Sequence, residues 1–244
     1  MLEHEGVRRR HLLPEMMDQP DLDPREHHRA LEGLERINRW SATARTLWRP
    51  IRHLLRQASA SSLTVLDVGC GGGDVAVSLW RKARAAGYAL EIDGWDLSPN
   101  AIDFAQRCAA EKGAKIHFCR CDALGPDWDR DYDVIVSSLF LHHLDDQQAV
   151  DLLRRMRQSA RRLVLINDLV RSPVGWVLAA MGTRMLSGSP VVRTDGPISV
   201  RRAFTRREVR ALAEQASMKG ATVQRRWPCR FLLNWSPTNA RSVS

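Results

Sequence analysis

The chain has 244 residues, of which 44% are hydrophobic and 27% are charged. This composition is that of a folded protein and excludes a disordered chain, and the length suits one α/β domain with short additions better than two independent domains. The formal net charge is +9, but the arginines are dispersed along the chain without the focused basic stripe that is typical of nucleic-acid-binding proteins, so nucleic acid is not an expected partner.

Cysteine spacing and hydropathy indicate where the protein works. The chain has five cysteines, and the spacing Cys119-x-Cys121 lacks the second pair of ligands that a structural zinc site requires. We therefore expect free thiols, no bound metal and a cytoplasmic location. Charges from Glu3 onwards leave no apolar segment for a secretory signal. The most apolar later stretch, residues 174–181, is too short to cross a bilayer, so no membrane span is expected.

The N-terminal part of the chain has two predicted regions. Residues 1–23 contain prolines and no periodic pattern, and we predict an irregular arm there. A helix is predicted to start just after the arm, because Asp23 can cap it, Pro24 suits its first position and Glu26 completes a capping box. This helix and a second one form a predicted lid over residues 24–58.

From residue 59 to residue 244 the pattern changes to short apolar runs that alternate with amphipathic helices. This alternation is typical of βαβ units, so we predict an α/β fold with a mostly parallel sheet and helices on both of its faces. The predicted strands cover residues 63–68, 89–95, 115–120, 132–137, 162–167 and 222–235.

Residues 172–199 interrupt the alternation. Their Gly, Pro, Met and Trp content predicts a helix and a loop inserted after the fifth strand, on the substrate side. Trp176, Met181 and Met185 would then form an apolar wall of a pocket, although residues of this kind also serve as ordinary core.

The segment from Val65 to Asp74 runs from an apolar strand directly into glycines. Glycines permit a sharp turn there and let a ligand approach the backbone closely. A dinucleotide-binding loop would have its third glycine at position 74, where this chain has Asp74. The carboxylate of Asp67 would repel a pyrophosphate, whereas it would stabilise a ligand with an ammonium or sulfonium charge.

At this loop the sequence resembles the class I S-adenosylmethionine-dependent methyltransferases, whose first motif is a strand that ends in acid-x-Gly-x-Gly-x-Gly. Asp67, Gly69, Gly71 and Gly73 match that motif at every position. The resemblance implies that Asp67 and the loop, Cys70 included, bind the methionine part of the cofactor. It also implies a Rossmann-like, doubly wound sheet of seven strands.

Two further motifs resemble the same family. Asp96 ends the second strand, next to Leu97, where the family binds the ribose hydroxyls with an acid. Asp122 and Ala123 follow the third strand and resemble the adenine-binding segment. Two simpler alternatives stay open, since Asp96 can cap the next helix and Asp122 can form a turn.

The fourth strand and its continuation, residues 132–144, resemble the small-molecule branch of the family, which includes quinone-biosynthesis and polyketide enzymes. Ser138 lies in this stretch and is assigned to the cofactor site. The motifs together span residues 60–170. They imply S-adenosylmethionine as cofactor, S-adenosylhomocysteine as product, no metal, and a small, aromatic or polyketide-type acceptor.

Methylation of a hydroxyl benefits from a base with a pKa near neutrality, and histidine is the natural candidate. His142 and His143 follow the fourth strand, at the edge where open α/β sheets bind ligands. We predict His143 as the base, with His142 and then Asp168 as the next candidates. O-methylation is favoured and C-methylation remains an alternative, as does a structural role in which the histidines only bond backbone carbonyls.

Two other functions compete with this prediction. A nucleic-acid methyltransferase would use the same cofactor, but the amino-directed motif is absent after the fourth strand, and the one Pro-Cys pair, Pro228-Cys229, lies far from it. A non-catalytic protein that binds S-adenosylmethionine for regulation would keep the same binding motifs. The identity of the acceptor and the oligomeric state stay open.

Overall fold

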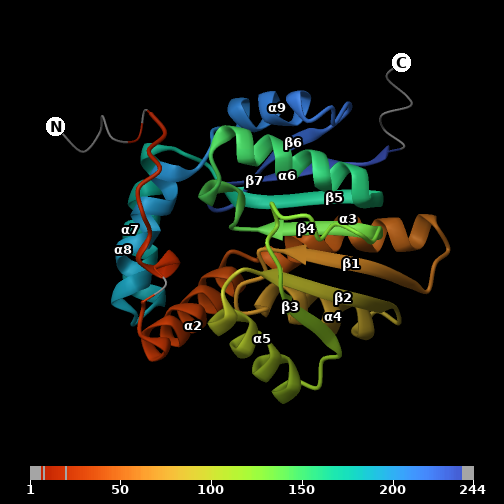
Figure 1. Ribbon diagram of the computed structural model, residues 1–244, viewed down its shortest axis with the longest axis horizontal. Helices are drawn as coiled ribbons and strands as arrows, with labels where there is room; N and C mark the ends of the chain where they lie inside the picture. Colours follow the sequence, from red (N-terminus) through yellow and green to blue (C-terminus); the bar gives the residue numbers. More distant parts are fainter. Residues whose placement is uncertain (1–6, 8, 20, 238–244) are drawn as a thin grey trace.

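The computed structural model describes residue 7, residues 9–19 and residues 21–237, and its centre is a seven-stranded sheet (Figure 1). The strand order is β3-β2-β1-β4-β5-β7-β6, and β7 alone runs antiparallel to its neighbours. The predicted α/β class and the mostly parallel sheet are confirmed. The strands are β1 (Ser62–Val68), β2 (Ala89–Asp96), β3 (Ile116–Arg120), β4 (Tyr132–Ser138), β5 (Ala160–Leu169), β6 (Thr222–Arg226) and β7 (Arg230–Trp235).

The last predicted strand was wrong in one respect. Residues 222–235 form a hairpin of two strands, β6 and β7, rather than one continuous strand. Pro228 has no N–H to donate to a sheet ladder, and Cys229 has a φ of 50°, so the chain reverses there. The reversal supplies the seventh strand and brings Arg230 to the carboxyl end of β5, opposite Leu169.

Helices cover both faces of the sheet. One face packs against α3 (Thr43–Gln57), α4 (Asp74–Ala85) and α5 (Pro99–Glu111), and the other packs against α6 (Asp146–Ser159) and α9 (Arg206–Gln215). Each face has its own hydrophobic cluster. The central strands contribute to both clusters because alternate side chains point to opposite faces.

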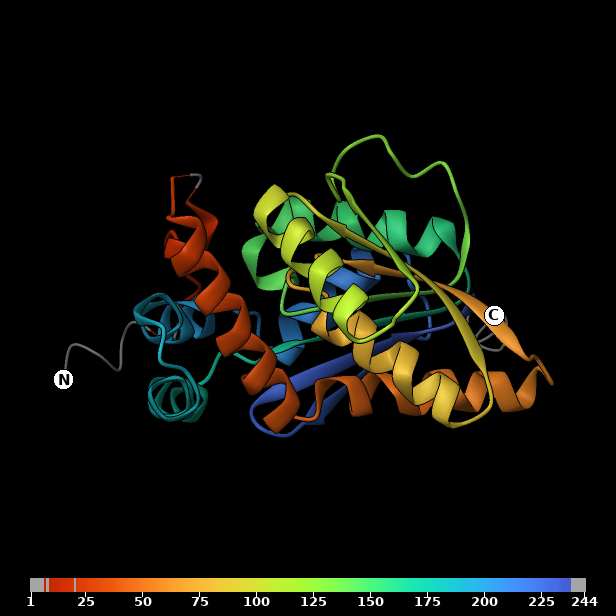
Figure 2. The same cartoon turned by 90° about the horizontal axis from the view of Figure 1, so that it is seen from below.

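The remaining helices form a cap beside the carboxyl ends of the parallel strands (Figures 1 and 2). They are α2 (Pro24–Trp40), α7 (Pro173–Leu186) and α8 (Pro190–Arg202). Helix α2 begins as predicted, since the Asp23 side chain accepts the backbone N–H groups of Arg25 and Glu26. The reciprocal bond from the Glu26 side chain is not among the contacts of the described residues. Residues 172–199 were predicted as a helix and a loop, but they contribute two packed helices.

The N-terminal arm packs against the helices of this cap. It contains a short 3-10 helix, η1 (Met16–Asp18), and it lies along α7 and α8 in Figure 1. The buried carboxylate of Asp195 on α8 accepts the backbone N–H groups of Met16 and Met17, each at 2.9 Å. These bonds fix the arm because the first N–H groups of a helix have no partner within it. Among the helices in the described part of the chain, none is long and apolar enough to cross a membrane.

We predict that Asp195→Asn loosens the arm. One acceptor oxygen becomes an amide donor facing an N–H group, and a lost bond of this kind costs about 1–3 kcal/mol. Hydrogen exchange of the Met16 and Met17 amides should accelerate, while Thr194→Ala, at an exposed neighbouring position, should leave it unchanged. Unchanged exchange in Asp195→Asn would show that the arm is held by other contacts.

Candidate functional site

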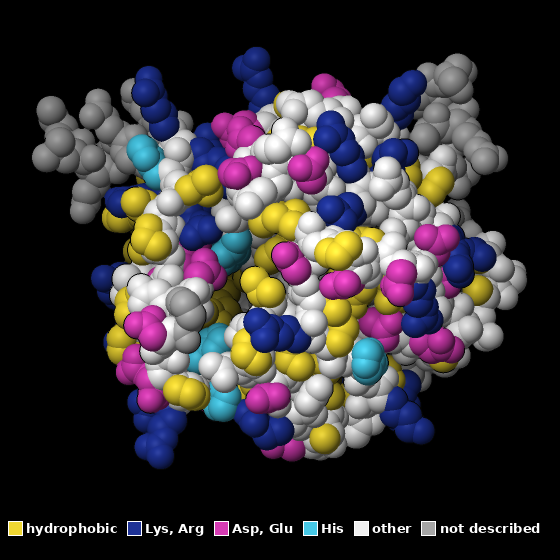
Figure 3. Space-filling view, viewed as in Figure 1, with side chains coloured by type: hydrophobic (Ala, Val, Ile, Leu, Met, Phe, Trp, Pro, Cys, Tyr) yellow, Lys and Arg dark blue, Asp and Glu magenta, His cyan; other side chains and the backbone are white. Residues whose placement is uncertain are grey.

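A cavity of about 980 Å³ lies between the cap and the carboxyl ends of the parallel strands. Figure 3 shows the hollow on the side of the cap helices, with histidine and hydrophobic side chains at its edge. Parallel strands open a crevice where the strand order reverses, which here is between β1 and β4. The predicted residues that line the cavity are Asp67, Gly69, Cys70, Gly71, Asp96, Leu97, Asp122, Ala123, Ser138, His142 and His143.

Asp67 is the most unusual group of the cavity. The residue lies near the carboxyl end of β1 and is 1% exposed. Neither of its carboxylate oxygens has a hydrogen-bond partner among the described residues. Burial, and then the charges of Asp74 and Asp96, raise the pKa of Asp67 well above its ordinary value. An unpaired buried carboxylate is costly, so this end of the cavity suits a ligand with a positive charge or with N–H donors.

The glycine loop places backbone, rather than side chains, beside Asp67. The N–H groups of Gly69 and Cys70 both donate to the carbonyl of Trp95 at 2.9 Å, which ties the loop to β2. Gly71 has a φ of 51°, and a Cβ there would lie 4.0 Å from the nearest side-chain atom, that of Leu31. The loop is therefore open to a ligand at Gly71.

Gly73, which was predicted to bind the cofactor, is not among the residues that line the cavity. A Cβ at Gly73 would lie 2.7 Å from the Phe118 ring and 2.9 Å from Cβ of Ala105. Its φ of 73° also belongs to the left-handed region that favours glycine. Gly73 thus permits close packing of α4 against β3 and α5.

Asp96 links the loop to the next helix. Its carboxylate accepts the N–H of Gly71 at 2.8 Å and the N–H of Ser98 at 2.9 Å. The N-cap of α5 is Ser98, whose hydroxyl accepts the N–H of Ala101, so Asp96 is not the helix cap. Burial raises the pKa of Asp96, against the hydrogen bonds that lower it. The remaining lone pairs of its oxygens can accept further hydroxyl donors.

The end of the cavity near β3 is more exposed. Asp122 accepts the N–H of Leu124 at 2.9 Å and its carbonyl accepts the N–H of Gly125, so it does form a turn, and it lines the cavity as well. Asp122 is exposed, whereas the neighbouring Ala123 is only 7% exposed. On the opposite side, the hydroxyl of Ser138 is buried without a hydrogen-bond partner among the described residues, so it is available to a ligand.

His142 and Asp168 form a buried pair. Nδ1 of His142 lies 2.7 Å from Asp168, which also accepts the backbone N–H of His142 at 3.1 Å. Although burial opposes it, the charge and the hydrogen bond of His142 lower the pKa of Asp168. Asp168 lies behind His142 and does not line the cavity, contrary to the expectation that it shares the rim.

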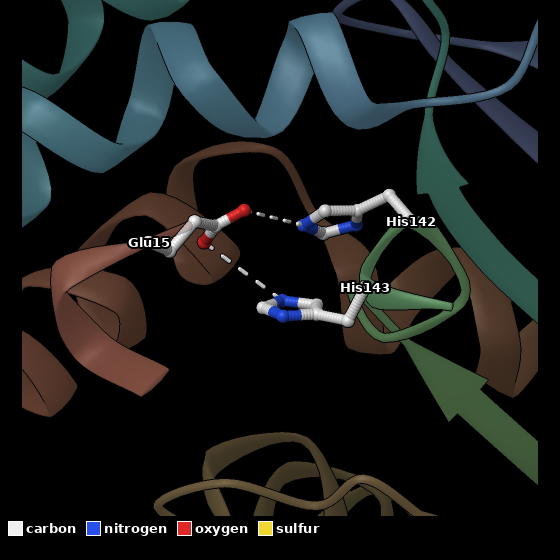
Figure 4. A group of neighbouring side chains, drawn as sticks. All are labelled: Glu15, His142 and His143. Carbon is white, nitrogen blue, oxygen red and sulfur yellow. Dashed lines mark ion pairs between the residues drawn. The ribbon is translucent and has the colours of Figure 1, made fainter. Parts of the chain in front are cut away.

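His143 and Glu15 complete this group, as Figure 4 shows. Nδ1 of His143 lies 3.0 Å from a carboxylate oxygen of Asp18. The buried carboxylate of Glu15 faces both imidazoles, with Oε1 at 3.7 Å from Nε2 of His142 and Oε2 at 3.9 Å from Nε2 of His143. Burial raises the pKa of Glu15 to about 7, against the charges of His143 and Arg202. Both imidazoles face carboxylates rather than backbone carbonyls.

Sequence reasoning missed Arg202 and Arg230. Arg202 is 6% exposed, donates to the carbonyls of Leu13 and His143, and lies 3.5 Å from carboxylate oxygens of Glu15 and Asp18. It thereby joins the arm to the segment after β4. The dispersed arginines gave no local signal that separates this one from its neighbour Arg201 in the sequence.

Arg230 lies on the other side of the cavity. It is 2% exposed and donates to the hydroxyl of Thr43 at 2.7 Å and to the side-chain oxygens of Asn38 and Asn167. Burial lowers the pKa of Arg230 to about 10, although the charges of nearby carboxylates oppose this. Arg230 thus ties β7 to α2 and α3 beneath the cap.

The residues predicted to form an apolar wall of the cavity were the wrong ones. Met181 and Met185 are 57% and 81% exposed, and neither they nor Trp176 line the cavity. Helix α7 presents its opposite side to the cavity, because that side packs toward α2 and α8. The apolar residues of α7 that do line the cavity are Leu178, Ala179 and Leu186.

Comparison with known proteins gives matches in sequence. A family model described as a methyltransferase domain matches residues 65–162. The ubiquinone biosynthesis O-methyltransferase of Nitrosomonas europaea is 31% identical over 134 residues, which are 52% of this chain and 52% of that protein. The protein of the same name from Nitrosospira multiformis is 28% identical over 139 residues, or 54% and 55% of the two chains. The chain spans about half the length of these curated relatives.

Solved structures match a larger part of the chain. Magnesium protoporphyrin IX methyltransferase from Synechocystis PCC 6803 with bound SAH matches with a TM-score of 0.56 and 18% identity, over 80% of this chain and 82% of that one. An O-methyltransferase family 2 protein from Planctomyces limnophilus in complex with apigenin has a TM-score of 0.55 and 18% identity, over 72% and 51%. Identities this low show a shared fold.

The unpaired carboxylate predicts how the stability of the ligand-free protein depends on pH. Because the pKa of Asp67 is raised on folding, the native state keeps a proton that the unfolded chain has lost above a pH of about 4. The free energy of unfolding should therefore fall as pH rises from about 4 toward the raised pKa. Asp67→Asn should remove this loss and be more stable than the wild type at pH 7, by about 1 kcal/mol or more.

Urea denaturation of the dialysed protein at pH 4 and pH 7 measures this difference. Asp103→Asn, at an exposed position on α5, is the matched control and should behave as the wild type. An Asp67→Asn variant that is less stable than the wild type at pH 7 contradicts the interpretation of Asp67 as an unpaired charge.

Proposed function

We propose that the chain is a class I S-adenosylmethionine-dependent methyltransferase and that it transfers a methyl group from S-adenosylmethionine to a small acceptor. The proposed acceptor is aromatic or of polyketide type, and the attacked atom is a hydroxyl oxygen. The observation that carries the proposal is the buried, unpaired Asp67 carboxylate beside an open glycine loop.

The residues of the cavity fit this cofactor at three places. Asp67 offers a charge partner for the ammonium group of the methionine part, beside the backbone of Gly71. Asp96 offers lone pairs to the ribose hydroxyls, and Asp122 and Ala123 lie where the adenine would reach the more exposed end. When bound, S-adenosylmethionine supplies an electrophilic methyl group on a positively charged sulfur.

The acceptor half of the cavity lies between the cap and the segment after β4. Leu178, Ala179 and Leu186 make it apolar, and His142 and His143 make one side polar. An apolar pocket with a few convergent polar groups is typical of small-molecule sites. We propose that residues 24–58 and 172–199, together with the arm, select the acceptor and exclude water from it.

In this proposal His143 removes the proton of the acceptor hydroxyl. Its side chain is 23% exposed, against 4% for His142, so a bound acceptor reaches it more easily. Asp18 holds Nδ1 of His143 and leaves Nε2 free to accept the proton. Asp168 acts as a positioning residue for His142. Holding the acceptor oxygen in line with the methyl group supplies the rest of the rate enhancement.

The cofactor assignment predicts tight binding of S-adenosylhomocysteine. Asp67→Asn should weaken binding at least about tenfold, since a charge-assisted contact is worth roughly 1.5–3 kcal/mol. Isothermal titration calorimetry measures the affinity, with Asp103→Asn as the matched control. Failure of the wild-type protein to bind S-adenosylhomocysteine refutes the proposed cofactor.

The assignment of His143 predicts a separation of binding from turnover. His143→Ala should lower turnover about 10²-fold or more, because a lost proton-transfer group costs that much, and should leave the affinity for S-adenosylhomocysteine intact. Formation of S-adenosylhomocysteine is followed on a panel of phenols, quinols and hydroxylated polyketides. His53→Ala, at an exposed position, should keep full activity. Full activity of His143→Ala would remove His143 from the mechanism.

A further inference from the structure

Three metal-ligating side chains meet in the acceptor half of the cavity. Each of Glu15, His142 and His143 offers one ligand atom, and these atoms all lie within 4.8 Å of one another. Figure 4 shows the carboxylate of Glu15 facing the two imidazoles, which come from the segment after β4 and pack against each other with ring centroids 4.4 Å apart. The separations of 3.7 and 3.9 Å between Glu15 and the two Nε2 atoms are shorter than twice a metal–ligand distance of about 2.1 Å. These two separations involve the two different oxygens of Glu15, and the third separation, between the imidazole nitrogens, is at most 4.8 Å, so small side-chain shifts bring all three residues within reach of one ion.

The second nitrogen of each imidazole is already held by a carboxylate. Nδ1 of His142 lies 2.7 Å from Asp168, and Nδ1 of His143 lies 3.0 Å from Asp18. A neutral imidazole that donates through Nδ1 keeps the lone pair of Nε2 free. In metal-binding histidines, the ring nitrogen that does not bind the metal commonly donates to a carboxylate, which orients the ring.

The centre of this group lacks a donor. One carboxylate oxygen of Glu15, Oε1, is buried and accepts no hydrogen bond from the described residues, although Nε of Arg202 lies 3.5 Å from it. Two imidazole lone pairs and a carboxylate then face one another, at separations too long for hydrogen bonds between them. Such a group of acceptors is stabilised by a cation at its centre.

The charge balance also favours a cation. The carboxylates of Glu15, Asp18 and Asp168 surround the two imidazoles, and Arg202 is the arginine in ion-pair contact with them among the described residues. Counting only these groups, with Glu15 ionised and the imidazoles neutral, three negative charges and one positive charge leave a net charge of −2. A divalent ion offsets that charge.

We propose that Glu15, His142 and His143 bind a divalent transition-metal ion of the zinc type. Two imidazoles and one glutamate form a known donor set for zinc, and it leaves a coordination position open for water or substrate. Here all three residues line the cavity, so a bound acceptor would have access to that position. The sequence-based expectation of no metal overlooked this site because Glu15 is more than a hundred residues away from the histidines.

The role of the ion rests on the proposed function. An acceptor hydroxyl oxygen that occupies the open position has a lower pKa, so that its O–H bond breaks and the proton passes to water. His143 then serves as a ligand, and the ion takes over the promotion of proton loss. The acceptor oxygen keeps its electron pair for the methyl group.

Cobalt binding tests the site without any acceptor. The full chain is freed of metal by dialysis against EDTA and titrated with Co²⁺, which reports a low-coordinate site through visible absorption. We expect one Co²⁺ per chain, displacement by Zn²⁺, and an affinity at least about tenfold lower in Glu15→Gln, His142→Ala and His143→Ala. His53→Ala is the matched control and should bind as the wild type.

The wild-type titration decides the proposal even where a variant fails to fold. Absence of stoichiometric Co²⁺ binding to the wild-type chain overturns it, as does equal affinity in folded His142→Ala and His143→Ala. Calorimetry with S-adenosylhomocysteine on the same EDTA-treated protein separates the two proposals. Binding of S-adenosylhomocysteine without Co²⁺ binding rejects the ion alone, whereas Co²⁺ binding without S-adenosylhomocysteine binding rejects the proposed cofactor.

Discussion

The unpaired carboxylate of Asp67 is the constraint on which the site depends. It lies at the carboxyl end of the central strand β1, and its two oxygens have no hydrogen-bond partner in the described part of the chain. Desolvation of such a carboxylate lowers the stability of the ligand-free fold, and buried ionisable groups without a partner cluster at functional sites. The glycines that follow keep side chains away from it, and the reversal of strand order beside β1 opens the crevice.

The two halves of the cavity handle charge differently. In the cofactor half, Asp67 has no hydrogen-bond partner among the described residues, and the negative charge of Asp74 further disfavours the ionised form of Asp67. Burial also raises the pKa of Asp74 to about 6. At the acceptor half, Arg202 and the two histidines share a compact network with carboxylates. The cofactor half is therefore suited to a ligand that carries a positive charge. The acceptor half is suited to accepting a proton, or to binding a metal ion in place of one.

The acceptor half is built from segments far apart in the chain. Asp195 on α8 holds η1, which fixes the adjacent Glu15 opposite the histidines that follow β4. Arg202 bonds the carbonyls of both the arm and that segment. Because each contact joins remote parts of the chain, a change in the arm alters the site as directly as a change in the sheet.

The sequence by itself determined the α/β fold, the start of α2 and the position of the glycine loop, because periodicity, caps and glycines act over a few residues. It also placed Asp96 and His143 at the ligand-binding edge. Only the tertiary structure decided that the C-terminal strand is a hairpin, that Gly73 serves packing, and which side of α7 faces the cavity. The partners of the histidines, Glu15 and Asp18, likewise emerged only on folding, because contacts over more than a hundred residues leave no local pattern.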